Sequence, residues 1–302
     1  MRTILPVAAV TAALACGALS MAAAESARFR FLTAIYGDTA GRGLHLPEGV
    51  ACGARGQVVV ADTGNHRLVV FTFQDKAVSA WREIALAELG SPTQVQLGPK
   101  GEIYALDSRQ RRVVRLSAEG QFLGALSWEG TPPPSTVVPK SFQVGADGTV
   151  YVLDVLSARV LVLEAGGRFQ RALPLPAETE FVTDVALDDL GNVIALDALG
   201  RRLYAAGRDA TTFAPLGPGL SDTLLTLPTS VTASRGLILI VEGSAGSIVS
   251  IGQDGTFVGR QLTPGWQDGS LNHPTRVCVN DKDEAFVADR DNSRVQVFAL
   301  GR

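Results

Sequence analysis

The chain has 302 residues, of which 46% are hydrophobic and 19% charged, and its formal net charge is −3. This composition is typical of a packed globular core and excludes an intrinsically disordered chain. The slight excess of acid argues against nucleic acid as a partner, because nucleic-acid-binding modules usually carry a basic patch.

The N-terminal segment differs from the rest of the chain. Arg2 precedes a long alanine-rich apolar run, and alanines at 22–24 supply the small residues that signal peptidases require. The pattern predicts a signal peptide over residues 1–24 and a single domain over residues 25–302. Two alternatives stay open, an uncleaved membrane anchor and a lipid anchor on Cys16. We therefore expect a periplasmic or extracellular protein with no transmembrane segment in its mature chain.

The remainder of the chain repeats itself at intervals of 43 to 47 residues. In most units a glycine precedes an acid by six residues, and an arginine follows the acid by five. The acids are Asp62, Asp107, Asp154, Asp197, Glu242 and Asp289. The arginines are Arg67, Arg112, Arg159, Arg202 and Arg294, with Ser247 in their place in the fifth unit. A shared period of this length predicts a repeat architecture.

Each unit contains four short runs with the composition of β-strands. In the first unit, residues 46–52, 56–62 and 66–73 are rich in β-branched and aromatic residues and are separated by Gly, Asp and Asn. A fourth run follows in most units, as at residues 121–128. The sixth unit ends too early for a fourth run, and residues 28–36 resemble the missing one. Six units of four strands predict an all-β, six-bladed β-propeller of antiparallel blades, closed by the N-terminal strand pairing into the last blade.

The first and last units carry a family resemblance. Residues 47–71 and 272–298 resemble NHL repeats, and the middle units keep the glycine, acid and arginine of the pattern except for Ser247 in the fifth. The resemblance covers residues 28–298 and implies a six-bladed propeller, in agreement with the strand count.

The acid and the arginine of each unit have a structural interpretation. A carboxylate that ends the second strand can accept turn amides, while an arginine that opens the third strand offers a fork of donors. We predict five such structural pairs and a less constrained fifth blade. The pairs are Asp62–Arg67, Asp107–Arg112, Asp154–Arg159, Asp197–Arg202 and Asp289–Arg294.

One end of the propeller collects the turns between second and third strands together with the connections between blades. Function in a propeller usually resides on such loops. Arginines and tryptophans gather there, as they do in binding interfaces rather than in catalytic pockets. The expected ligand-binding residues are His45, Arg109, Arg111, Trp128, Arg201, Trp266, His273 and Arg290.

The innermost strands should line the central channel with a polar ring. The second residue after each repeat proline, or after Val182 in the fourth unit, is Gly49, Gln94, Ser141, Asp184, Ser230 or Arg276. One acid and one base in this ring suggest a pair. A catalytic metal would need several converging carboxylates, so no metal, cofactor or catalytic residue is predicted.

Cys52 and Cys278 lie on innermost strands of adjacent blades, five and four residues past their prolines. Because side chains alternate along a strand, we expect the two thiols to face opposite ways. We therefore predict no disulfide between them.

These features favour an exported, non-catalytic propeller that binds an envelope protein or a polymeric ligand through its loop face. Two alternatives remain. One is a metal-dependent propeller hydrolase or lyase with a site at the channel entrance near Asp184, Gln94 and the histidines. The other is a structural subunit of an envelope assembly.

Overall fold

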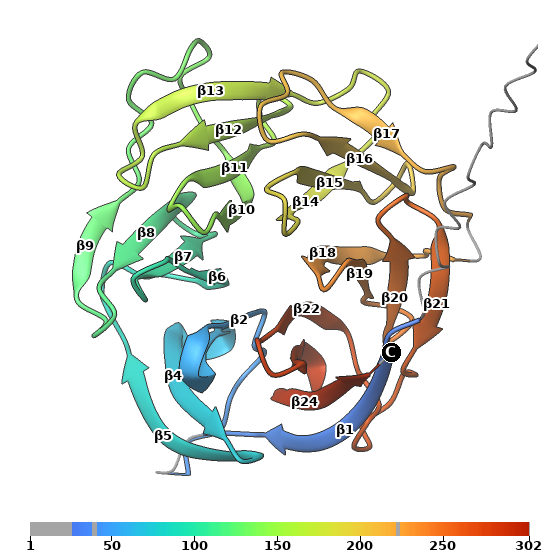
Figure 1. Ribbon diagram of the computed structural model, residues 1–302. Helices are drawn as coiled ribbons and strands as arrows, with labels where there is room; N and C mark the ends of the chain where they lie inside the picture. The colour runs from blue at the N-terminus through green and yellow to red at the C-terminus, as the bar shows by residue number, and fades with distance from the viewer. Residues whose placement is uncertain (1–25, 38–40, 222–223, 302) are drawn as a thin grey trace, which may run out of the picture.

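The computed structural model describes residues 26–37, 41–221 and 224–301. These residues form six four-stranded antiparallel sheets arranged as a ring around a common axis (Figure 1). The predicted six-bladed β-propeller is confirmed. The predicted signal peptide, with Cys16, lies outside the described residues.

The blades follow one another along the chain, and each sheet runs from the axis outward. Blade one consists of β2 (Gly49–Cys52), β3 (Gln57–Asp62), β4 (Arg67–Gln74) and β5 (Ala77–Ile84). Blade two consists of β6 (Pro92–Leu97), β7 (Ile103–Asp107), β8 (Arg112–Leu116) and β9 (Phe122–Ala125). Blade three consists of β10 (Pro139–Val144), β11 (Val150–Asp154), β12 (Arg159–Leu163) and β13 (Phe169–Pro174).

Blades four to six repeat the same order. Blade four consists of β14 (Val182–Leu187), β15 (Val193–Asp197), β16 (Arg202–Ala206) and β17 (Ala214–Leu216). Blade five consists of β18 (Pro228–Ser234), β19 (Leu237–Glu242), β20 (Ser247–Gly252) and β21 (Phe257–Gln261). Blade six consists of β22 (Pro274–Val279), β23 (Glu284–Asp289), β24 (Arg294–Gly301) and β1 (Arg28–Ile35). Short 3₁₀ turns occupy η1 (Ala54–Gly56), η2 (Thr63–Asn65) and η3 (Arg290–Asn292).

The two ends of the described chain meet in blade six. Strand β1 pairs antiparallel with β24 from Arg28 opposite Gly301 to Ile35 opposite Val295. The predicted closure is therefore confirmed, and β1 covers what would otherwise be an open sheet edge. Figure 1 shows β1 lying outside β24, at the opposite end of the colour scale.

The recurring glycine of the repeat supplies a left-handed backbone conformation. Gly56 ends the turn before β3 with φ of 77°, and a Cβ there would lie 2.2 Å from the carbonyl oxygen of Phe73. Asp283 takes this place in the sixth unit with φ of 59°. Aspartate is among the few other residue types that visit this region routinely.

Apolar side chains pack between neighbouring blades, because the two faces of each sheet are turned toward the two adjacent sheets. On β2, Val50 packs toward blade six with Phe286. The next residue, Ala51, packs toward blade two with Val95. The core of the molecule is therefore a series of six interfaces around the ring.

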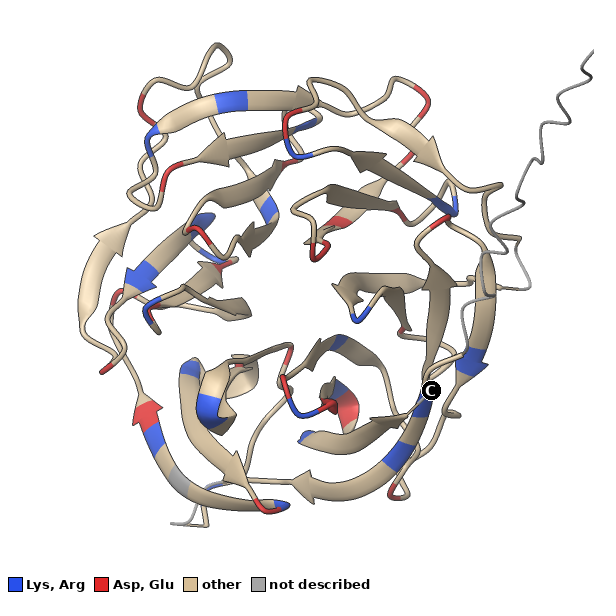
Figure 2. Ribbon diagram, viewed as in Figure 1, with Lys and Arg blue, Asp and Glu red and all other residues tan. Residues whose placement is uncertain are grey.

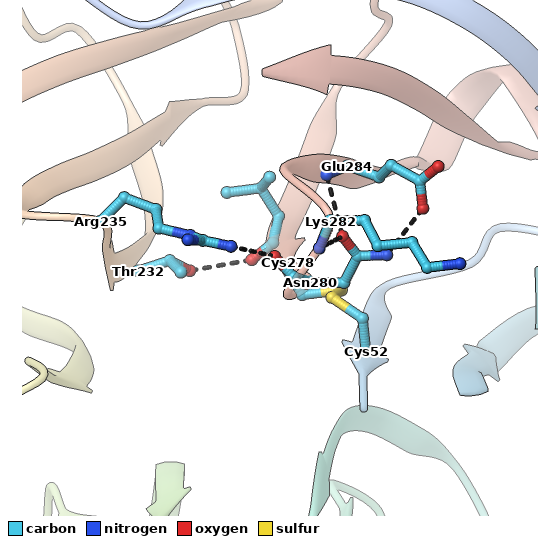
Figure 3. The surroundings of a disulfide bond; sticks show 8 residues. Cys52, Thr232, Arg235, Cys278, Asn280, Lys282 and Glu284 are labelled. Atoms are coloured by element: carbon cyan, nitrogen blue, oxygen red, sulfur yellow. Dashed lines mark hydrogen bonds between the residues drawn. A yellow bond between two sulfur atoms is a disulfide. The ribbon is translucent and has the colours of Figure 1, made fainter. Parts of the chain in front are cut away.

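The prediction that Cys52 and Cys278 remain apart is wrong. They form a disulfide with a Cα–Cα distance of 5.9 Å, and it joins blade one to blade six (Figure 3). The two side chains do project from opposite faces of their strands: Cys52 shares the face of Val50, toward blade six, whereas Cys278 lies on the face opposite Val277, toward blade one. In a ring of blades, each sheet turns one face toward the preceding blade and the other toward the following blade. Side chains on opposite faces of adjacent blades therefore meet, and the two sulfurs lie together.

No helix among the described residues has the length and apolar character needed to cross a membrane.

Candidate functional site

The acid of each repeat binds the backbone of the connection that leads into its own blade. The amide of His45 donates to Asp62 Oδ1 at 2.7 Å, and the amide of Asn272 donates to Asp289 Oδ1 at 2.6 Å. The same contact joins Thr226 to the carboxylate of blade five at 2.8 Å. Hydrogen bonds to a charged acceptor are stronger than neutral ones. The acid therefore anchors the connection and the adjoining turn at one end of the molecule, which we call the loop face.

Three blades add a buried ion pair to this anchor. The carboxylate and the arginine Nε lie 2.7 to 3.0 Å apart, and both side chains are almost fully buried. The guanidinium also donates to connection carbonyls, as Arg159 does to Pro132 and Pro134. The three pairs are Asp62–Arg67, Asp154–Arg159 and Asp289–Arg294.

Blades two and four depart from the expectation. Neither Asp107 with Arg112 nor Asp197 with Arg202 forms an ion pair in the described part of the chain, although each couple is opposed in the strand register. Backbone amides satisfy both carboxylates instead, four of them on Asp107 and three on Asp197. The acid therefore holds the connection even in blades where the arginine does not pair with it.

Blade five has a buried acid and Ser247 where other blades have arginine. Glu242 is fully buried, and its Oε2 accepts the amides of Thr226 and Leu227. Its Oε1 has no hydrogen-bond partner among the described residues. Burial raises the pKa of the Glu242 carboxyl above its ordinary value.

A raised pKa in the folded state makes stability depend on pH. Between the ordinary value of 4.5 and the raised value, the native state binds more protons than the unfolded chain. The free energy of unfolding should therefore fall as pH rises from 4.5 through the raised pKa of Glu242. Glu242→Gln keeps an amide acceptor without the charge. As pH rises through this range, the wild type should lose free energy of unfolding relative to Glu242→Gln. The loss should be about 1.4 kcal/mol for each pH unit between the ordinary and the raised pKa. Urea unfolding at several pH values measures this, and parallel curves for the two proteins would contradict it.

Some of the predicted ligand-binding residues are exposed, and others are held by packing or by hydrogen bonds. Arg109 and Arg111 are exposed on the turn of blade two, His45 is exposed, and Trp266 is 79% exposed. Trp128, by contrast, is partly buried against the core between blades two and three.

The remaining three are held by hydrogen bonds. Arg201 donates its Nε to the carbonyl oxygen of Leu225 at 3.1 Å. Arg290 contacts Glu48 at 3.3 Å and Asp291 at 2.6 Å, and His273 Nδ1 lies 2.8 Å from the same aspartate. Blades six and one thus carry a connected network of charges on the loop face.

The loop face also has an apolar part, which the sequence did not predict. Five large hydrophobic residues on blades three to five are between 38% and 55% exposed. They occupy the turns after the acid and the last positions before the innermost strands. Amide–carbonyl bonds join turn to connection in each blade, as from Ala198 to Phe181. We call these residues the apolar arc: Val155, Leu156, Phe181, Leu199 and Leu227.

Charge of one sign does not gather on one part of the ring. Figure 2 shows Lys and Arg interspersed with Asp and Glu around all the blades. The asymmetry of the loop face is therefore one of apolar against charged side chains, with the apolar arc on blades three to five and the charged network on blades six and one.

Asp184 is the centre of the polar ring beneath the loop face. Its Oδ1 accepts hydrogen bonds from the Ser141 hydroxyl and, at 3.1 Å, from Arg276 Nη2. Its Oδ2 accepts the amide of Val231 at 2.8 Å. The four residues belong to blades three, four, five and six, so one fully buried carboxylate joins four blades across the axis. Both of its oxygens are engaged.

Two further ring residues lie beside this centre. Gln94 bonds the backbone of Phe142 in the next blade through both ends of its amide, at 2.6 and 3.2 Å. Ser230 is fully buried, and its hydroxyl has no partner among the described residues. The ring residues thus join neighbouring blades just below the loop face.

The structure does not assemble the histidines into a metal-binding set. Within residues 26–37, 41–221 and 224–301, no three His, Cys, Asp or Glu side chains come together in a group that could hold a metal ion.

The fold defines a six-bladed β-propeller. A family model described as the NHL repeat matches residues 44–71 and 271–298, which belong to blades one and six. No curated protein matches the chain.

Solved structures of the same fold include enzymes and a protein complex. A gluconolactonase from Xanthomonas campestris is 14% identical with a TM-score of 0.66, over 91% of this chain and 90% of that one. An inactive virginiamycin B lyase from Staphylococcus aureus with quinupristin is 12% identical with a TM-score of 0.65, over 91% and 100%. A chain of a nidogen–laminin complex is 15% identical with a TM-score of 0.58, over 72% and 80%. At these identities the likeness shows the fold alone.

Proposed function

We propose that the protein is an exported, non-catalytic binding propeller that holds an envelope protein on its loop face. The apolar arc is the observation that carries this proposal. Single exposed hydrophobic residues are ordinary on protein surfaces, but a set of them on neighbouring loops at one end of a ring is typical of an interaction site. Polypeptides rather than polysaccharides offer the aliphatic and aromatic side chains that such a surface would bury.

The construction of the loops supports a binding surface. Each repeat acid holds the connection into its blade through at least one backbone amide, so the loops are held before a ligand arrives. A preorganised surface loses little conformational entropy on binding, and this favours affinity. Arg109 and Arg111, exposed on the blade adjoining the arc, would pair with acidic groups at the edge of the partner.

The channel entrance supports a non-catalytic role. Asp184 is the acid that a hydrolase or lyase would have at this point, and it is fully buried with both oxygens accepting hydrogen bonds. A carboxylate engaged in this way is poorly placed to take a proton from a substrate on the loop face.

Capture from the native envelope fraction tests the proposal. The immobilised wild type is compared with Leu156→Ser/Leu199→Ser, which makes the arc polar. The matched control is Leu123→Ser/Leu190→Ser, which changes two leucines outside the loop face that are 51% and 72% exposed. We expect one protein partner to be recovered by the wild type and the control, and about tenfold less by the arc variant.

Two results would overturn this function. Equal recovery by all three proteins would move the contact off the loop face and favour a structural subunit. Recovery of a polysaccharide in place of a protein would replace the ligand class.

A further inference from the structure

A polar cavity occupies the channel at the end opposite the loop face. Its volume is about 190 Å³, and all six innermost strands contribute to its wall. The lining residues come from the later parts of these strands, whereas the loop face lies at their beginnings. Its polar lining residues are Gln96, Gln143, Thr232, Ser234 and Arg276.

Arg276 provides the one charge in this lining. The residue is 8% exposed, and its Nη2 donates to Asp184 at 3.1 Å. Its Nε and Nη1 have no partner among the described residues. Asp184 itself is not part of the cavity wall, so the group presented to the cavity is a guanidinium with free N–H donors.

Uncharged donors surround the guanidinium. The Gln96 amide and the Ser234 hydroxyl have no hydrogen-bond partner in the described part of the chain. Gln143 is held in place by its Nε2, which donates to the carbonyl oxygen of Val185 at 2.9 Å. Thr232 is fixed in the same way by a 2.9 Å bond to Val277, beside the disulfide (Figure 3). Two of the four uncharged polar side chains are thus held in place before a ligand binds, and the other two have free hydrogen-bonding groups.

From this arrangement we propose that the cavity binds a small organic carboxylate. A guanidinium fork matches the planar geometry of a carboxylate, and amide and hydroxyl donors can complete its hydrogen bonds. No Asp or Glu lines the cavity to repel an anion. The volume suits a ligand of only a few non-hydrogen atoms, since one water occupies about 30 Å³ of liquid. The carboxylate site does not depend on the loop face, so an experiment can contradict one proposal and leave the other standing.

Calorimetric titration of the full chain with acetate, glycolate and succinate tests the proposal, with acetamide and inorganic phosphate as comparison probes. We expect at least one carboxylate to bind saturably and to raise the melting temperature. Acetamide should bind at least about tenfold more weakly because it lacks the charge. Binding of phosphate alone, equal binding of acetamide, or no saturable binding of any carboxylate would each overturn the proposal.

Gln96→Leu locates the site without disturbing Asp184. We expect this variant to fold normally and to lose about tenfold in carboxylate affinity. Gln57→Leu, a partly exposed glutamine outside the cavity, is the matched control and should bind as the wild type does. Arg276→Lys keeps a cation beside Asp184 but removes the fork, and should lower affinity further. Unchanged affinity in both Gln96→Leu and Arg276→Lys would place the ligand elsewhere and overturn the assignment.

Discussion

Replacing Arg294 by methionine should lower the free energy of unfolding by about 3–5 kcal/mol, the usual cost of breaking a buried ion pair from one side. The Arg294 side chain is 2% exposed, and its Nε lies 2.7 Å from Asp289. Its remaining donors reach the Tyr36 hydroxyl at 2.9 Å and the carbonyl oxygens of Gln267 and Ser270 at 2.8 and 3.0 Å. Methionine fills part of the space but leaves the carboxylate and both carbonyls without this donor.

Arg112→Met is the matched control, because it changes the same repeat position in a blade without the ion pair. Among the residues that the structure describes, the Arg112 side chain makes one hydrogen bond, from Nη2 to the carbonyl oxygen of Glu88. We expect a loss below about 1 kcal/mol, since the carboxylate of Asp107 keeps all its backbone donors. Urea unfolding of both variants measures the difference. Similar losses in the two would mean that the arginine stabilises every blade alike and would contradict the division described above.

Removing the disulfide should destabilise the protein by about 2–4 kcal/mol. The bond joins residues 226 positions apart, and cross-links that close long loops restrict the unfolded chain most. Cys52→Ser/Cys278→Ser should unfold at lower urea concentration than the wild type. Reductant should weaken the wild type to a similar extent and leave the variant unchanged. Equal unfolding midpoints for oxidised wild type and variant would show that the bond adds nothing to stability.

The architecture could be predicted from the sequence because each blade is specified by short sequence patterns. Gly56 and its counterparts set a turn that few other residue types adopt without strain, and acids such as Asp62 accept backbone amides from their own repeat. The resemblance of residues 28–36 to a fourth strand was enough to predict closure. Each of these signals can be recognised in one short stretch of sequence.

Features that depend on relations between blades were predicted less well. The disulfide was not predicted because side chains on opposite faces point apart within one sheet. Cys52 and Cys278 belong to two sheets that face each other, where opposite faces meet. The apolar arc was missed because Leu156 and Leu199 stand singly in the sequence and become neighbours only through the ring. The ion pair expected at Asp107 did not form because backbone amides outnumber side-chain donors there.

The position of the disulfide also determines how the molecule would carry a mechanical load. Arg28 lies opposite Gly301, so a pull on the two ends of the described chain would separate β1 from β24 one residue pair at a time. Once β1 had come away and blade six had begun to unravel, tension would pass from Cys52 directly to Cys278 through the sulfur–sulfur bond. The chain between these residues would then bear no force, which leaves blades two to five shielded from any tether at the termini.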